Sequence, residues 1–571
     1  MSTDVQPWWK PQPRAPGVRV LTGYQRKWLR GDIIGGFTVA AYLIPQVMAY
    51  ATIAGLDPVA GLWAILPAMV LYAFLGTSRL MSVGPESTTA LMTAAAIGPI
   101  AYGDPGRYAL LASALALATG LICLLFWLVK LGFIADLLSL PILVGYMAGI
   151  AVIMIAGQLD KLTGVAVTGD NFVDQVRSFI ENISAVHTPT VVLAAGMLTF
   201  LLVGQHFLPR LPIPLLAVLL ATAVTFFFGL QDVGIKVVGS VPSGLPNLVM
   251  PNLHDIWLVV LPAFGVVLVG YTDNMLTARA FVSPEHDPVD ANQELLALGV
   301  SNVGAGIVQG FPVSSSASRT AIGQAAGTNS QIYSLVAGAV VVATLLFLGP
   351  VLGNFPTAAL GAIVVFAALR LIDLAGFRRI ANFRIAELLL ALAALAGVLV
   401  FGILNGVILA VALSVADMLF RVARPHSAVL GTVEGLAGMH DVGDFPSVVT
   451  EPGLVVFRYD SPLFFANAED FHRKVMEAVD GVDKPVYWFL LNMEANVEVD
   501  ITGLDAMEAV RRELTDEGIV VALARVKHEL LQDLDSFGLV EAIGVDHIFP
   551  TMPTALQGFR DWRSDHGGPL G

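Results

Sequence analysis

Long apolar segments fill most of the chain between residues 33 and 419, and they constrain its fold more than any other feature. A helix that crosses a bilayer needs about 20 consecutive, mostly apolar residues, and most of these segments are long enough. The 571-residue chain is 56% hydrophobic and only 13% charged, with a mean hydropathy of +0.74. Soluble globular proteins are far less apolar. The pattern therefore predicts a polytopic membrane protein.

The apolar segments form two sets of seven, and the third member of each set is shorter than its neighbours. The first set is Ile33–Ile53, Val59–Gly76, Ala90–Ala101, Leu110–Leu128, Leu138–Gly157, Thr190–Phe207 and Ile213–Phe228. The second set is Leu258–Ala280, Glu294–Val308, Ala317–Ala326, Tyr333–Leu348, Thr357–Leu371, Ile385–Phe401 and Ile403–Leu419. Paired short segments at corresponding places in two halves indicate a transporter site near the bilayer midplane.

The two short segments open with the same pattern, Pro-x-Ser-hydroxyl-hydroxyl-Ala. It reads Pro85-Glu86-Ser87-Thr88-Thr89-Ala90 in the first half and Pro312-Val313-Ser314-Ser315-Ser316-Ala317 in the second. A helix that begins inside a membrane leaves unpaired N–H groups and the positive end of its dipole away from water. We expect some hydroxyls to cap these groups, and a bound anion to neutralise them. The pattern predicts an oxyanion site at Ser87, Thr88, Ser314, Ser315 and Ser316.

Ionisable residues inside a membrane are functional candidates by default, since each costs several kcal/mol to place there. Arg319 follows Pro312 by seven residues, so it lies near the start of the short helix and could attract the anion or pair with Glu86 or Asp273. Asp273 shares a helical face with Thr277, and it could bind a cation, take up a proton or form a salt bridge with Arg319. Glu86 would repel an anion unless it is protonated or paired, which makes it a second coupling candidate.

Clusters of basic residues predict the orientation of the spans. They lie at Arg26 to Arg30, at Arg370 to Arg384 and at Arg421 to Arg424, and fourteen spans put them all on one face. Cytoplasmic loops carry an excess of Lys and Arg. We therefore expect a cell-membrane protein with both termini in the cytoplasm, an N-terminal segment of residues 1–30 and a transmembrane domain of residues 31–424.

Beyond Pro425 the hydrophobic pattern changes to alternating strands and helices. Strands are predicted at Leu454–Tyr459, Val486–Leu491 and Ile519–Ala524, and helices at Leu504–Leu514 and Lys527–Asp535. From Gly431 onward there are 25 acidic and 10 basic residues, a balance of −15, so this region accounts for the formal net charge of −14 of the whole chain. The pattern predicts a small, acidic α/β domain over residues 425–560 and a tail over residues 561–571.

Three motifs carry a resemblance to a known family: Pro45-Gln46-Val47-Met48-Ala49-Tyr50-Ala51, Gly84-Pro85-Glu86-Ser87, and Phe311-Pro312-Val313-Ser314-Ser315-Ser316-Ala317-Ser318-Arg319. Together they resemble the sulfate permease (SulP) family of anion transporters, and the C-terminal domain resembles the STAS domain of that family. The resemblance extends from Tyr24 to about Phe559. The sequence is most similar to actinobacterial members that are commonly described as sulfate transporters.

The resemblance implies an all-α polytopic membrane domain of fourteen helices in two inverted repeats, a core domain that carries the substrate past a gate domain, and dimers with cytoplasmic STAS domains. It places Gln46, Tyr50, Ser318 and Arg319 at the anion site, although Gln46 and Tyr50, four residues apart on one helical face, could also be polar contacts between helices. In similar bicarbonate transporters the residues that match Asp273 and Thr277 help bind sodium. In plant sulfate transporters an acidic residue at the matching place is tied to protons.

These observations predict a secondary active transporter that moves a small inorganic oxyanion by an elevator-type motion. Sulfate is the first choice, with proton or sodium coupling; a sodium-dependent bicarbonate transporter is the alternative, and an anion channel or exchanger is a further one. The expected partners are the anion, membrane lipid and a second copy of the chain, and nucleic acid is not expected. No Gly-x-x-x-x-Gly-Lys-Ser/Thr sequence, nucleophile–base arrangement or metal-ligand spacing occurs, so we expect no enzyme, no catalytic residue, no cofactor, and no metal other than a possible sodium ion at Asp273 and Thr277.

Overall fold

The chain divides into two compact units, Met1–Ser414 and Val415–Gly571. The computed structural model describes residues 15–101, 103–136, 139–169, 171–208, 212–239, 244–282, 289–445, 447–483 and 485–566. Residues 1–14 of the predicted N-terminal segment and residues 567–571 of the predicted tail lie outside the described residues.

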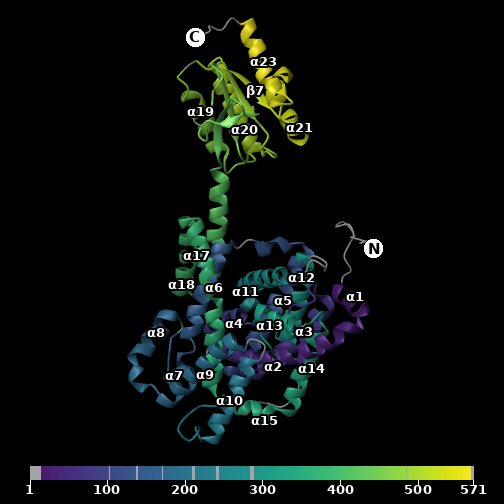
Figure 1. Ribbon diagram of the computed structural model, residues 1–571, viewed down its shortest axis with the longest axis vertical. Coiled ribbons are helices and arrows are strands. Elements are labelled where there is room, and N and C mark those ends of the chain that lie inside the picture. Colours follow the sequence, from purple (N-terminus) through teal and green to yellow (C-terminus); the bar gives the residue numbers. More distant parts are fainter. Residues whose placement is uncertain are drawn as a thin grey trace. The chain divides into compact units, whose positions relative to one another are not determined.

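The first unit is built from helices (Figure 1). These are α1 (Pro16–Thr22), α2 (Leu29–Ile53), α3 (Val59–Leu75), α4 (Ser87–Ala101), α5 (Pro105–Leu128), α6 (Leu140–Ala156), α7 (Leu159–Thr163), α8 (Phe172–Glu181), α9 (Thr188–Phe207), α10 (Ile213–Phe227), α11 (Leu253–Ala280), α12 (Ala291–Ile307), α13 (Ala317–Ala325), α14 (Ile332–Phe347), α15 (Gly349–Gly353), α16 (Thr357–Leu371), α17 (Leu374–Phe383) and α18 (Ile385–Ala423).

Each of the fourteen predicted apolar segments coincides with a helix or part of one. Within the described residues, seven helices are long and apolar enough to cross a membrane, and α3, α4, α10 and α14 are shorter apolar helices. The last two predicted segments both belong to α18, which turns at Gly402 with a φ of 79°. Glycine adopts this left-handed conformation without the steric cost that a side chain adds. Several helices begin earlier than predicted: α4 begins at Ser87 rather than Ala90, α5 at Pro105 rather than Leu110, and α11 at Leu253 rather than Leu258.

The helices of the first unit form two bundles. Helices α2 to α5 pack with α11 to α14, whereas α6, α7, α9 and α10 pack with α16, and α2 meets α16 where the bundles touch. Within the first bundle, a Cβ added at Gly120 of α5 would lie 2.7 Å from the carbonyl oxygen of Gly299 on α12. Small residues let membrane helices approach this closely.

A two-stranded sheet joins the two halves of the chain inside the first bundle. Strand β1 (Val83–Gly84) pairs antiparallel with β2 (Ser314–Ser315), with Val83 opposite Ser315 and Gly84 opposite Ser314. Helix α4 begins shortly after β1, and α13 begins shortly after β2. The two short helices therefore start next to each other, although more than 200 residues separate them in sequence.

The second unit is an α/β domain, as predicted. Its mixed sheet has the order β4-β3-β5-β6-β7-β8, in which β3 is antiparallel to both neighbours and the later strands are parallel. The strands are β3 (Ser427–Gly431), β4 (His440–Asp441), β5 (Leu454–Tyr459), β6 (Trp488–Asn492), β7 (Val520–Ala524) and β8 (Ile548–Phe549). The helices are α19 (Ala468–Asp480), α20 (Ile501–Asp516), α21 (His528–Ser536), α22 (Leu539–Ile543) and α23 (Met552–Asp565).

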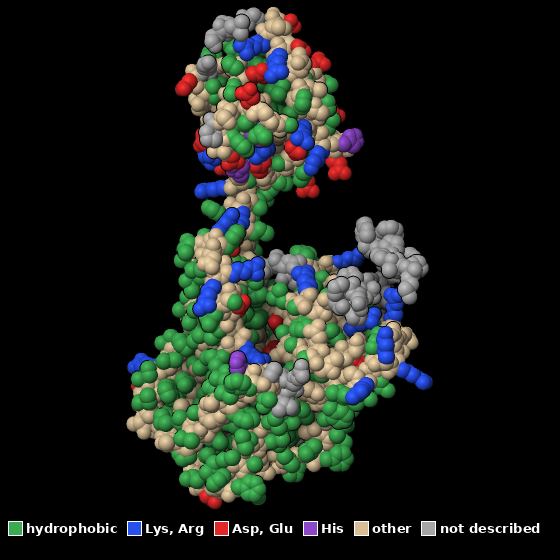
Figure 2. All heavy atoms as spheres, in the orientation of Figure 1, with side chains coloured by type: hydrophobic (Ala, Val, Ile, Leu, Met, Phe, Trp, Pro, Cys, Tyr) green, Lys and Arg blue, Asp and Glu red, His purple; other side chains and the backbone are tan. Residues whose placement is uncertain are grey.

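The apolar cores on the two faces of this sheet show how the helices cover it. Helices α19, α20 and α21 pack on one face, and α23 packs on the other against Trp488. Helix α23 continues past residue 560, the predicted end of the domain. Acidic and basic side chains dot the surface of this unit, whereas hydrophobic side chains dominate the first unit (Figure 2).

Candidate functional site

Side-chain amides hold the two segments that lead into α4 and α13. Gln331, just before α14, donates to the carbonyl oxygens of Ser78 (3.0 Å) and Met81 (2.8 Å). The amide of Asn302 on α12 donates to the carbonyl oxygen of Val313 (3.0 Å) and accepts from its N–H (2.9 Å). An amide can do both because it carries a donor and an acceptor. These bonds hold in place the backbone around β1 and β2, and so position the starts of α4 and α13.

We predicted that some hydroxyls cap the helix starts, but no hydroxyl caps α13. Ser316 is its N-cap residue, but no side chain there accepts from a backbone N–H, and the Ser316 Oγ lies 3.2 Å from the Ser318 Oγ. At α4, Ser87 donates to the Glu86 carboxylate (3.2 Å) and Thr89 donates to the Glu86 carbonyl oxygen (3.1 Å). The N–H groups in the first turn of α13, which have no partner within the helix, are thus not capped by a side chain.

A closed ring of polar contacts links α2, α4 and α13. The Gln46 amide donates to the Tyr50 hydroxyl (2.9 Å), which donates to Glu86 (3.3 Å). The other carboxylate oxygen of Glu86 lies 3.7 Å from Arg319 Nη1, and the same Nη1 donates to Gln46 Oε1 (3.3 Å). The four predicted site residues therefore come together, and Gln46 uses both ends of its amide within the ring.

Arg319, the fourth member of the ring, is fully buried. Its side chain is 0% exposed, Nη1 donates to the carbonyl oxygen of Pro85 (2.9 Å), and Nε donates to Ser82 Oγ (3.2 Å). Its remaining nitrogen, Nη2, is buried without a hydrogen-bond partner. The arrangement contains the predicted ion pair with Glu86, and it also leaves one donor of the guanidinium unused.

A cavity of about 170 Å³ opens beside this ring. At about 30 Å³ per water molecule, it holds on the order of five waters, enough space for a small oxyanion and part of its hydration shell. Predicted site residues supply most of its polar lining: Gln46, Tyr50, Glu86, Ser87, Thr88, Asp273, Ser315 and Ser318. Ser314, Ser316, Thr277 and Arg319 are buried and do not line it.

Asp273 is the second carboxylate at the cavity. Its Oδ2 accepts from Ser315 Oγ at 3.5 Å, the limit of a hydrogen bond. No ion pair joins Asp273 to Arg319 in the described part of the chain. Thr277 lies one helical turn further along α11 and away from the cavity, so the structure does not bring it together with the anion-site residues.

The second bundle supplies cavity residues that the sequence interpretation missed. Arg370 of α16 lines the cavity, and its guanidinium carbon lies 4.6 Å from the ring centre of Phe366. From the sequence, we used Arg370 only as one of the basic residues that predict the orientation of the spans. Tyr42 of α2 also lines the cavity, and its spacing of four residues from Gln46, and eight from Tyr50, was a signal that could have identified it.

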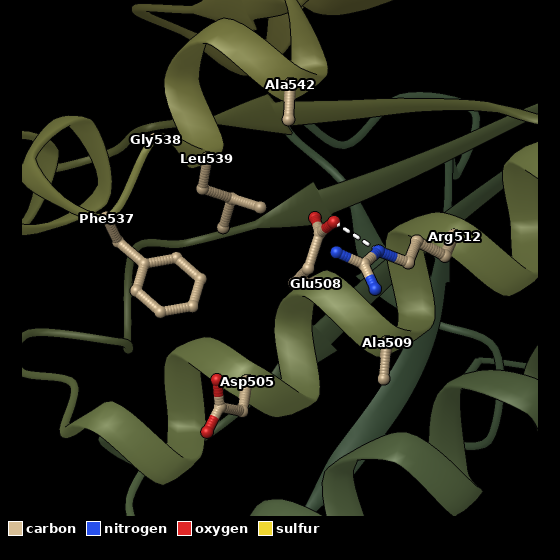
Figure 3. A pocket seen from close by; sticks show the side chains of 8 residues that line it. All are labelled: Asp505, Glu508, Ala509, Arg512, Phe537, Gly538, Leu539 and Ala542. Atoms are coloured by element: carbon tan, nitrogen blue, oxygen red, sulfur yellow. Dashed lines mark hydrogen bonds and ion pairs between the residues drawn. The ribbon is translucent and has the colours of Figure 1, made fainter.

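The second unit contains a different cavity, of about 340 Å³, between α20 and the α21–α22 region (Figure 3). Glu508 lies at its edge and forms ion pairs of 2.6 Å with both Arg511 and Arg512. Hydrogen bonds from these arginines, Arg511 first, hold the pKa of Glu508 below its usual range. Its charge is thus already balanced. Across the described residues, no cluster of three or more His, Cys, Asp or Glu side chains could hold a metal ion.

Comparison with known proteins identifies the family. Residues 29–394 match the sulfate permease family, and residues 445–555 match the STAS domain. The chain belongs to the sulfate permease family. A probable sulfate transporter of Mycobacterium tuberculosis is 54% identical over 548 residues, which cover 96% of this chain and 98% of the relative. Probable sulfate transporter 4.2 of Arabidopsis thaliana is 28% identical, over 92% of this chain and 80% of the relative.

Solved structures support the fold of this family member. The murine Solute Carrier 26 family member A9 anion transporter superposes with a TM-score of 0.88 at 22% identity, over 97% of this chain and 96% of that chain. The transmembrane domain of the cyanobacterial bicarbonate transporter BicA superposes with a TM-score of 0.59 at 23% identity, over 69% of this chain and 98% of that chain. These matches confirm the predicted helical membrane domain with a C-terminal STAS domain. The family and the relatives are transporters rather than enzymes, as predicted.

Proposed function

We propose that this sulfate permease is a secondary active transporter that carries sulfate together with a proton across the cell membrane. The observation that carries the proposal is the cavity between the linked starts of α4 and α13, which is lined by hydroxyls and a tyrosine. Small oxyanions need donors that approach from several directions, and two helix N-termini with hydroxyls supply them. Relatives named as probable sulfate transporters support sulfate as the anion.

Charge balance at the cavity favours a divalent anion with a proton. Arg319 and Arg370 carry two positive charges near it, and Glu86 and Asp273 carry two negative charges when ionised. Each helix N-terminus adds about half a positive charge, so the two short helices add about one. Protonation of one carboxylate then gives about two positive charges, which match sulfate, whereas two ionised carboxylates leave about one, which matches bicarbonate.

Asp273 is the better candidate for the proton. Glu86 is already engaged by Arg319, Tyr50 and Ser87, so a proton there would break an ion pair. Among the described residues, the Asp273 carboxylate accepts one hydrogen bond, the long one from Ser315. We place the coupling proton on Asp273 and assign Glu86 to the ring.

Sodium-coupled bicarbonate transport is the second candidate, favoured by Asp273 and Thr277 on one face of α11 and by the fold that this chain shares with BicA. Sodium needs several oxygen ligands at short range. Thr277 is buried and does not line the cavity with Asp273, and this weakens the sodium alternative. Sulfate with a proton therefore remains the proposal.

Transport in proteoliposomes separates these candidates. Purified full-length protein is given labelled sulfate or labelled bicarbonate under an inward proton gradient, an inward sodium gradient, or neither. Sulfate accumulation driven by protons supports the proposal. Bicarbonate accumulation driven by sodium supports the alternative, currents far above transporter turnover indicate a channel, and uptake of neither anion contradicts both transporter assignments.

The elevator motion, the dimer and the orientation belong to the same proposal. The cavity takes its lining from both bundles, with Met147, Ala367 and Arg370 on the α6 and α16 side, so sliding one bundle past the other would move the site. We expect a homodimer with both termini in the cytoplasm, in agreement with the basic segment ends. Mass photometry in nanodiscs tests the dimer, and protease access to the STAS domain from sealed vesicles tests the orientation.

A further inference from the structure

Helix α17 (Leu374–Phe383) lies between α16 and α18, at the end of the apolar segment Thr357–Phe383, which is long enough to cross a membrane. Its ten residues extend about 15 Å, half of the roughly 30 Å hydrocarbon core of a bilayer. It is therefore too short to be a span. A short helix at the end of a span, with one apolar and one charged face, is suited to a membrane interface.

The two faces of α17 differ in side-chain type. Ile380 is only 5% exposed and packs inward, and Phe377 lies on the same side. Arg378 and Arg379 are exposed on the opposite side. Leu374 and Phe383, which begin and end the helix, are 64% and 65% exposed. The surface of α17 thus combines two arginines with two bare apolar side chains.

These arginines have no carboxylate partner in the part of the chain that the structure describes. Arg378 and Arg379 take part in no recorded ion pair or hydrogen bond, and Arg384, just after the helix, contacts only the ring of Phe383, at 5.1 Å. Helix α8 (Phe172–Glu181) makes a useful contrast. It has the same length, but its one arginine, Arg177, is paired with Glu181 at 2.8 Å.

We propose that α17 is a docking site for anionic phospholipids, with Arg378 and Arg379 on the phosphate groups and Leu374 and Phe383 among the acyl chains. Arginine binds phosphate oxygens through two parallel N–H groups. An acidic protein surface would satisfy the arginines but would leave the two exposed apolar side chains in contact with water. A phospholipid matches both parts of the surface.

The site lies next to the transport cavity along the chain. Helix α17 follows α16 after two residues, and α16 carries Arg370, which lines the cavity. A lipid bound to α17 therefore holds the end of a helix that forms one wall of the cavity. Binding itself does not depend on which anion is carried, so the test below is independent of the proposed transport function.

Native mass spectrometry of the full-length protein tests the proposal, using mixed micelles that contain phosphatidylglycerol and phosphatidylcholine in equal amounts. The wild-type protein should retain phosphatidylglycerol in preference to phosphatidylcholine. Each arginine near an anionic surface contributes about a fivefold factor, so the double variant Arg378→Gln/Arg379→Gln should bind phosphatidylglycerol about thirtyfold more weakly. Arg177→Gln on α8 is the matched control and should behave as the wild type.

Several outcomes would overturn the assignment. Equal retention of the two lipids by the wild type, or equal retention of phosphatidylglycerol by the wild type and the double variant, would show that α17 does not select anionic headgroups. Loss of dimerisation in the double variant with unchanged lipid retention would make α17 a protein interface instead. Elution as a single species on size exclusion, with an unchanged unfolding midpoint, shows that the variants are folded.

Discussion

The two short helices α4 and α13 start side by side, yet they bring opposite charges to the site. Glu86 immediately precedes α4, and Arg319 lies in the first turn of α13. The recorded polar partners of Arg319 belong to the other half of the chain: Gln46, Ser82, Pro85 and Glu86. The similar backbones of the two helix starts therefore determine where the site lies, while their different side chains, Glu86 and Arg319, connect the two halves of the chain.

The segments that lead into the two helices show the same contrast. The segment before α4 is held by Gln331 from the second half of the chain. The segment before α13 is held by Asn302 from its own half. An amide holds each segment, but the amide before α4 comes from the other half of the chain and the amide before α13 comes from the same half.

Removing Arg319 should have the largest effect on this comparison. Arg319→Ala leaves Glu86 without its cation, and breaking a buried ion pair costs about 3 to 5 kcal/mol. We expect a marked fall in the unfolding midpoint and loss of sulfate binding, measured by thermal unfolding and calorimetry.

The double variant Arg319→Ala/Glu86→Gln separates the structural role of Arg319 from attraction of the anion. It removes the unpaired carboxylate, so most of the lost stability should return, whereas sulfate binding should stay absent. If the double variant binds sulfate as well as the wild type, Arg319 is a brace between the two halves and nothing more.

Asp273→Asn should have the next largest effect, on coupling rather than stability. When one proton enters with each sulfate, uptake by the wild type falls about tenfold per pH unit once Asp273 is ionised. Sulfate binding is therefore strongest while Asp273 is protonated, and it weakens as the pH rises and this carboxyl ionises. The amide mimics the protonated acid, so sulfate exchange should persist with a flat pH profile.

Glu86→Gln is the matched control for this experiment, since it removes the other carboxylate of the cavity. A flat pH profile in Glu86→Gln, with a normal profile in Asp273→Asn, would move the coupling proton to the ring and reverse our assignment.

The sequence predicted those features of the fold that depend on residues close together in the chain. Apolar length and proline, glycine and hydroxyl positions are local, and they located the fourteen segments, the break at Gly402 and the paired helix starts. The strands at Leu454–Tyr459 and Ile519–Ala524 were found in the same way, from short apolar runs with turn residues on either side.

The rest depended on contacts between distant residues. No sequence pattern shows that Gln46 closes a ring with Arg319, because the two are 273 residues apart. Arg370 looked like an ordinary basic residue at a helix end, and only packing of α16 against α2 puts it at the cavity. The capping that we predicted for some hydroxyls does not occur at α13 for a related reason, since the Ser316 hydroxyl contacts Ser318 and accepts from no backbone N–H.

Asn302 and Gln331 allow the two helix starts to be weakened one at a time. Asn302→Ala leaves both the N–H and the carbonyl of Val313 buried without partners, and each such group costs about 1 to 3 kcal/mol. Gln331→Ala leaves only carbonyl oxygens, which tolerate loss of a partner better. We expect a lower unfolding midpoint for both and a larger fall for Asn302→Ala. Equal midpoints for the two variants would contradict this account.

Arg370 should show the smallest effect, because its guanidinium is exposed and salt screens it. Arg370 supplies the positive charge on the α16 side of the cavity, opposite the two helix starts. Arg370→Gln should therefore slow sulfate entry severalfold at low ionic strength. The difference from the wild type should shrink as salt is raised, and Arg370→Lys should restore most of the rate. Arg424→Gln is the control, since that arginine stacks on Phe420 at 5.3 Å much as Arg370 stacks on Phe366 but does not line the cavity. If the two glutamine variants lose the same rate, the positive charge acts on the whole surface, and the anion site is then confined to the two helix starts.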